Sequence, residues 1–157
     1  MIQRKQTIFL LLALFSFVFL FAFPFASFKL GTEITCYISL LAIQNLDGFD
    51  KLNYMFIIMQ VLATLFLSLT GVAIFMFKKR PLQVRLCAFA FLTNVFIIGA
   101  MFLTASMVVK ELNFANDNLV TYLLPMYIPI LTAPCVMFAQ RAIRKDEAMV
   151  RSLNRLR

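Results

Sequence analysis

One stretch decides the fold: Lys78-Lys79-Arg80-Pro81-Leu82-Gln83-Val84-Arg85, which carries four positive charges and no negative charge. Long uncharged, apolar runs lie on both sides of it. In a membrane protein such a turn faces the cytoplasm, because Lys and Arg resist translocation. The direction of this one turn sets the direction of every other segment. The sequence therefore predicts two helical hairpins joined at residues 78–85.

The composition favours a bilayer over water as the solvent of this chain. Of its 157 residues, 62% are hydrophobic and 14% are charged, against about a quarter charged in an average soluble domain. A soluble protein of this size could not bury so much apolar surface. The net charge of +8 gathers at the ends of apolar runs, which indicates topology and affinity for anionic headgroups. It does not indicate binding to nucleic acid.

Four uncharged runs are long enough to cross a hydrocarbon core of about 30 Å as helices. The first could instead be a cleaved signal peptide, but it exceeds the usual apolar length and Pro24 stands where a small residue is expected. We interpret it as a retained anchor. The predicted spans, within a single domain of residues 1–157, are approximately residues 7–28, 52–77, 86–109 and 119–140, followed by a tail at 141–157.

The longest loop, between the first two spans, has a strand-like alternation. Polar residues alternate with apolar ones from Glu33 to Leu40, and Gly31-Thr32 could turn this segment back on residues 28–30. This pattern favours a short β-hairpin in the first outer loop. Residues 40–43 could equally begin a short interfacial helix.

The charge alternates from one end of each span to the next. The net charge is +2 in the head, −1 in the first outer loop, +4 in the basic turn, −1 in the second outer loop and +4 in the tail. This alternation is typical of a four-span protein with both termini in the cytoplasm. The predicted fold class is therefore an all-α membrane protein with four transmembrane helices and a cytoplasmic, helical C-terminal tail.

The second span carries a seam of polar and small residues. At 100° per residue its members fall within an arc of about 80°. Such a face usually marks contact between helices, and a substrate path is the functional alternative. Asn94 on the third span could pair with Gln60 if their depths match. The predicted packing seam comprises Asn53, Gln60, Thr64, Ser68, Gly71 and Asn94.

The fourth span contains Pro125, Pro129 and Pro134. Each proline removes a backbone donor and clashes with the preceding turn, so this helix is expected to bend. Broken helices occur at transporter binding sites, and prolines also bend helices for packing alone. The spans hold no Asp, Glu, Lys or Arg, which argues against proton relays, ion-coupled carriers and voltage sensors.

Catalytic residues, a metal site and a cofactor are not predicted. The chain has no His, which is the usual general base and the commonest metal ligand near neutral pH. Its three cysteines are far apart and form no C-x-x-C pair. We therefore expect that the protein is not an enzyme.

The tail, drawn as a helix continuing the fourth span, is amphipathic. Its apolar arc covers about 140° and is interrupted by Asp146 and the terminal Arg157. An amphipathic helix resting on anionic lipid would explain both faces, but it would not require the acidic pair Asp146-Glu147. A protein partner could use both signs of charge. The predicted docking tail comprises Arg144, Lys145, Glu147, Arg151 and Arg155.

Two stretches carry a family resemblance: the opening Met1-Ile2-Gln3-Arg4-Lys5-Gln6-Thr7, and the close from Arg141 to Arg157. Together they resemble the bacterial family of small integral membrane proteins known as domain of unknown function 4293. The resemblance covers the whole chain and implies a location in the bacterial inner membrane. It implies no activity and transfers no functional residue.

The sequence thus predicts a non-catalytic inner-membrane protein, an accessory or scaffold subunit that docks a partner in the membrane or the cytoplasm. Its second partner is a bilayer with an anionic inner leaflet. The alternative is a small transporter or channel component that uses the bent fourth helix. The oligomeric state stays open.

Overall fold

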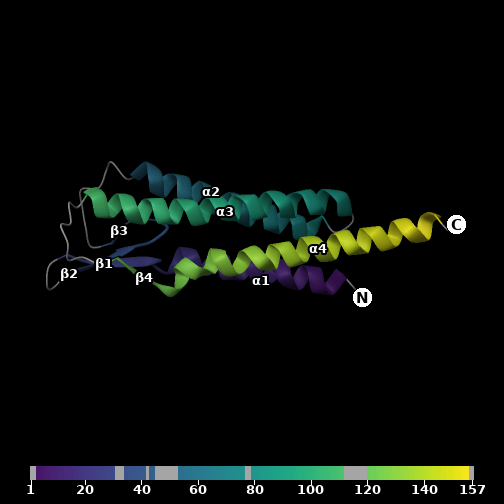
Figure 1. Cartoon of the computed structure of the whole chain (residues 1–157), viewed down its shortest axis with the longest axis horizontal. Coiled ribbons are helices and arrows are strands. Elements are labelled where there is room, and N and C mark those ends of the chain that lie inside the picture. The colour runs from purple at the N-terminus through teal and green to yellow at the C-terminus, as the bar shows by residue number, and fades with distance from the viewer. Residues whose placement is uncertain are drawn as a thin grey trace.

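The computed structural model describes residues 3–30, 34–41, 43–44, 53–76, 79–111 and 120–155. Within these ranges, four long helices lie along one another and a small sheet closes one end (Figure 1). We call this end the sheet end and the opposite end the basic end. The helices are α1 (Gln3–Ala22), α2 (Asn53–Phe75), α3 (Arg80–Glu111) and α4 (Ile128–Arg155), the last preceded by the 3-10 turn η2 (Leu124–Tyr127).

The helices pack in a ring, in which α1 contacts α2, α2 contacts α3, α3 contacts α4 and α4 contacts α1. The most extensive contacts join α2 to α3, α3 to α4 and α4 to α1, whereas α1 and α2 share a smaller one. The expected first hairpin, α1 with α2, is therefore looser than the second. The long loop and sheet between these two helices leave α1 free to pack mainly on α4.

The predicted β-hairpin is confirmed. Strands β1 (Ala26–Leu30) and β2 (Ile34–Ile38) are antiparallel, with Phe28 opposite Cys36. The side chains of Phe28, Cys36 and Ile38 lie on the buried face of the sheet, as the alternation predicts. Residues 43–44 form a further short strand, and not the interfacial helix that was the alternative for this part of the loop. The sheet has the order β3-β2-β1-β4, with β3 at Ile43–Gln44 and β4 at Thr121–Tyr122.

The first helix ends earlier than the run 7–28 predicts. It stops at Ala22, and the chain enters β1 at Ala26. Pro24 explains the stop, because proline disfavours the helical conformation of the residue before it and cannot donate a backbone hydrogen bond. The last part of the uncharged run therefore contributes to the sheet and not to the helix.

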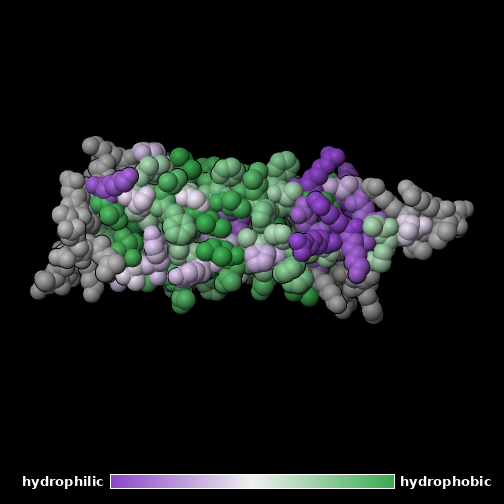
Figure 2. Space-filling model, viewed as in Figure 1, coloured by the Kyte–Doolittle hydropathy of each residue, from purple (hydrophilic) through white to green (hydrophobic). Residues whose placement is uncertain are grey.

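Exposed large hydrophobic side chains occur on all four helices, and we call this surface the hydrophobic belt. On the face drawn in Figure 2 it covers the middle of the bundle, and hydrophilic residues gather toward the basic end. Among the described residues, three helices could cross a membrane by length and composition: Asn53–Phe75, Arg80–Lys110 and Leu124–Met149. The apolar part of α1, Gln6–Ala22, is shorter. These helices fit a membrane protein. Inside the ring the core is filled by large side chains, such as Phe17 and Phe66 with ring centroids 4.3 Å apart.

Candidate functional site

The basic end is held together by a buried polar cluster centred on Asp146. The Nε2 amide of Gln6 on α1 donates a hydrogen bond to the Asp146 carboxylate on α4. Arg80, at the start of α3, donates from its guanidinium to the Asp146 backbone carbonyl at 3.2 Å. Both Gln6 and Asp146 are buried. We call these three residues the Asp146 clamp, because it joins three helices at one point.

Two further amides strengthen the same end. Gln83 of α3 donates to the Ala73 carbonyl of α2 at 3.0 Å, and Gln140 of α4 donates to the Val84 carbonyl of α3 at 3.2 Å. With the Asp146 clamp, these bonds tie every helix of the ring to a neighbour. Polar side chains thus fix the mutual positions of the helix ends where the apolar core stops.

Beyond the clamp, α4 continues as an unbroken helix to Arg155 and projects past the ends of the other helices (Figure 1). Arg144 and Lys145 are exposed and Glu147 is half-buried. The side chains of Arg151 and Arg155 lie outside the described part of the chain. The helical tail is therefore present, and the residues of the predicted docking face that can be placed lie on its accessible side.

Asp146 requires a correction to the argument for the tail. The acidic pair Asp146-Glu147 was expected to serve a partner, but Asp146 is buried and engaged by Gln6 within the chain. Its place on the apolar arc of the tail was the signal that could have revealed this. An acid among apolar positions faces the interior, where it needs a partner. Sequence inspection alone missed Gln6, Arg80, Gln83 and Gln140 as members of this end.

The predicted seam of α2 does not pack against other helices of this chain. Asn53, Thr64 and Ser68 are exposed, and the space around Gly71 is open. The hydroxyls of Thr64 and Ser68 bond to carbonyls of their own helix. Gln60 donates to the Leu41 carbonyl beside the sheet at 3.1 Å. The face of α2 that packs consists of Phe56, Met59, Ala63, Phe66, Thr70 and Ala73.

Asn94 forms a buried polar contact between α3 and α4. Its Nδ2 donates to the Pro129 carbonyl at 2.8 Å and to the Thr132 hydroxyl at 3.2 Å, both on α4. Asn94 Oδ1 has no hydrogen-bond partner among the described residues. Gln60 and Asn94 do not bond each other, since each bonds a different segment.

The three prolines occupy different positions from those expected. Pro125 lies in η2 and Pro129 is the second residue of α4, where a missing backbone donor costs little. Pro134 alone of the three stands inside the helix and must leave the Ile130 carbonyl without its usual donor. The prolines therefore define how α4 begins more than how it bends.

An open apolar groove lies at the sheet end, where α1 ends and η2 begins. It encloses about 500 Å³, and its lining includes Phe19, Phe23, Leu124 and Ile128. Phe23 and Leu124 are among the exposed hydrophobic side chains. A groove of this composition offers van der Waals contact to a hydrocarbon chain and little to a polar solute.

The chain matches the family described as a domain of unknown function (DUF4293) over residues 2–156. It belongs to the DUF4293 family. No curated protein and no solved structure matches it. The DUF4293 match includes the bundle, the sheet and the projecting tail, so the Asp146 clamp and the tail belong to one family unit.

The described residues of this DUF4293 protein hold no group of three or more His, Cys, Asp or Glu side chains that could bind a metal ion. Cys36, Cys87 and Cys135 are not in disulfides, and Cys36 and Cys87 are buried. Burial raises the pKa of the Cys36 thiol, which lowers its reactivity near neutral pH. What the described residues offer at these positions is apolar packing surface and charged side chains.

Proposed function

We propose that this protein is a non-catalytic integral membrane subunit, an accessory or scaffold protein that docks a partner through the end of α4. One observation carries the proposal: α4 runs as a single helix from beside the end of α1 near the sheet to Arg155, past the ends of its neighbours (Figure 1). The Asp146 clamp fixes the base of this projection. Arg144 and Lys145 are exposed on it. A rigid, charged helix on a fixed base is suited to presenting a binding face.

The proposed setting is the bacterial inner membrane, with four spans and both termini in the cytoplasm. The exposed cations Arg85 and Arg141 lie at the basic end, and the exposed Lys110 lies at the sheet end. The larger positive charge supports placing the basic end in the cytoplasm. The proposal of four spans requires α1 to cross the membrane beside the three longer helices. It lies along α4 for much of its length. Its apolar part is about 26 Å long at 1.5 Å per residue, enough for most of a hydrocarbon core.

Cysteine labelling tests this topology. In a cysteine-free background, Lys110→Cys and Lys79→Cys each place one thiol at an exposed position at opposite ends of the bundle. An impermeant maleimide added to intact spheroplasts should label the first thiol only. Labelling of the second thiol only would reverse the orientation, and labelling of both would show that the bundle does not span the membrane.

The docking role is tested with a truncation placed after Glu147. This variant keeps the Asp146 clamp, so the bundle should insert and unfold thermally as the full chain does. A photo-crosslinker at Ser152, an exposed tail position, should capture a defined partner. The same crosslinker at Lys110 is the matched control. Equal capture at both positions, or identical co-purification by the truncated chain, would contradict the docking role.

The alternative function is a small transporter or channel component. Asn94 supports it, because a buried acceptor without a partner at the start of α4 could receive a hydrogen bond from a polar solute. A transporter would show a substrate-dependent thermal shift that Asn94→Leu abolishes. The accessory role is favoured because the described groove is apolar and Asn94 is not among its lining residues.

A further inference from the structure

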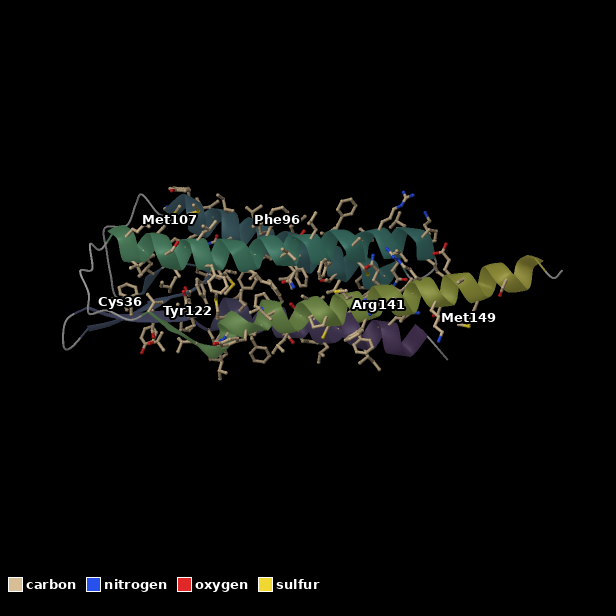
Figure 3. All side chains as sticks on the ribbon, viewed as in Figure 1. Cys36, Phe96, Met107, Tyr122, Arg141 and Met149 are labelled. Atoms are coloured by element: carbon tan, nitrogen blue, oxygen red, sulfur yellow. The ribbon has the colours of Figure 1, made fainter. Side chains whose placement is uncertain are left out.

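Exposed cations at the basic end take no part in the Asp146 clamp. Lys79, Arg85 and Arg141 are exposed, while Arg80 is half-buried and donates to the Asp146 carbonyl. Figure 2 shows hydrophilic surface gathered at this end over α3 and α4, and Figure 3 marks Arg141 on α4. We call Arg85 and Arg141 the arginine patch.

Two helices contribute to the patch at the same level of the bundle. Gln140 of α4 bonds the Val84 carbonyl of α3, so the residues that follow each of these, Arg141 and Arg85, lie on adjacent helices at nearly equal height. Packed helix axes are about 8–10 Å apart. Two guanidiniums on such helices can reach two anionic groups that belong to one molecule.

The acids near the patch are already engaged. Asp146 is buried and accepts a hydrogen bond from Gln6, and Glu147 is half-buried with an interaction of its own. The positive charges of Arg85 and Arg141 are therefore not compensated by these two acids. Guanidinium groups pair with phosphate through two parallel hydrogen bonds, which makes phosphate the complementary anion.

The surface next to the patch identifies the source of the phosphate. One turn from Arg85 along α3 is the exposed Phe89, and one turn from Arg141 along α4 is the exposed Phe138. The cations thus border the hydrophobic belt directly. The Phe138 ring packs beside Phe9 of α1, with centroids 6.1 Å apart, and still exposes about half of its surface. A free phosphate would leave the exposed surface of both rings uncovered, whereas an amphiphile could cover the cations with its headgroup and the rings with its acyl chains.

We propose that the arginine patch binds a phospholipid that carries two phosphates, with the headgroup between α3 and α4 and the acyl chains on the adjoining apolar surface. Basic pockets between helices at a cytoplasmic membrane surface bind headgroups of this class. A lipid with one phosphate would pair with one arginine and leave the other uncompensated. The inference rests on the proposed membrane insertion, but it does not depend on the docking role of the tail.

The test uses the purified full chain in detergent and native mass spectrometry with added cardiolipin or phosphatidylglycerol at equal phosphate concentration. Cardiolipin should bind in a one-to-one complex at lower lipid concentration. Arg85→Gln and Arg141→Gln should each weaken this complex about fivefold, and the double variant about 25-fold. Arg85→Lys with Arg141→Lys should bind more weakly than the wild type and more tightly than the double Gln variant, since the charge is kept and the two-bond geometry of the guanidinium is lost. Lys110→Gln, which removes an exposed cation at the sheet end, is the matched control and should bind as the wild type does.

Several results would overturn the arginine patch as a site for a two-phosphate lipid. Equal binding of the two lipids, equal loss in Lys110→Gln, or no loss in the double variant would each do so. Thermal unfolding of every variant in detergent without added lipid should match the wild type, because the substituted side chains are exposed. A wild-type chain that fails to fractionate with membranes would contradict the proposed function itself and not the lipid preference alone.

Discussion

The Asp146 clamp makes a quantitative prediction about how α1 is held. Replacing Asp146 with Ala removes the acceptor of the Gln6 amide, which is buried and would lose the one partner that the structure gives it. A hydrogen bond to a charged group contributes about 1.5–3 kcal/mol to stability. The bond from Arg80 ends on the Asp146 backbone carbonyl, so it survives the substitution. The expected loss of unfolding free energy is therefore about 1.5–3 kcal/mol.

A double-mutant cycle with Gln6→Ala separates the pair from its surroundings. The coupling energy between the two substitutions should be about 1.5–3 kcal/mol, because each removes the same bond. Asp146→Asn is the matched variant. It keeps an oxygen for the Gln6 amide without the charge, so its loss should be smaller, about 0.5–1.5 kcal/mol.

Equilibrium unfolding in mixed detergent micelles gives these free energies, with the buried Cys87 thiol as a natural probe of exposure through a thiol-reactive dye. The order of stability should be wild type, then Asp146→Asn, then Asp146→Ala. A coupling energy below about 0.5 kcal/mol would mean that the two sites act independently. That outcome would refute the clamp as the link between α1 and α4.

Three further predictions concern the predicted site residues. Gln60→Leu should cost about 1 kcal/mol, since it removes a hydrogen bond to the loop, whereas Thr64→Leu with Ser68→Leu should leave the thermal unfolding of the monomer unchanged. Asn94→Leu should cost no more than about 1 kcal/mol in detergent unfolding, because the two bonds that are lost are offset by removal of an unpaired oxygen. Cys36, in the sheet, should react slowly with maleimide in the folded protein and faster as the pH rises, because its raised pKa leaves less thiolate at neutral pH; unfolding should abolish the difference, and fast labelling at neutral pH would contradict its burial.

The bilayer explains why much of the architecture could be predicted. Run lengths and the charges between them are constraints on single segments, and they predicted four helices and the helical tail. The predicted basic turn at residues 78–85 was too long, because Arg80 to Arg85 form the first part of α3. The β-hairpin followed from the local alternation that places Phe28 opposite Cys36. Each of these features depends on residues that are close in sequence, so the sequence pattern carries them directly.

The polar contacts between distant segments could not be predicted in the same way. Gln6 and Asp146 are 140 residues apart, and only the ring arrangement of the helices brings them together. That arrangement also places α1 mainly against α4, which charge and hydropathy leave undetermined. The early end of α1 was a local effect of Pro24 that the length of the uncharged run concealed.

The failure of the α2 seam has a physical cause that extends across the bundle. A Ser or Thr hydroxyl on a helix can bond a carbonyl three or four residues earlier, so it needs no neighbour. Thr64, Ser68 and Thr93 all do this. A carboxamide in a helix has a longer reach and two donors, and the backbone of its own turn cannot satisfy it. The buried and half-buried amides whose contacts are described all bond outside their own helix: Gln6, Gln60, Gln83, Asn94 and Gln140.

This contrast changes how polar residues on these spans are interpreted. A polar arc composed mainly of hydroxyls, such as Thr64 and Ser68, is compatible with a surface that faces lipid. An isolated amide such as Asn94 marks a contact with another segment even where no arc surrounds it. The amides, and not the hydroxyls, therefore specify the mutual positions of the helices. Substitutions in this bundle should accordingly cost more at the amides, where a neighbouring segment loses a donor, than at the exposed hydroxyls, where they should be nearly neutral.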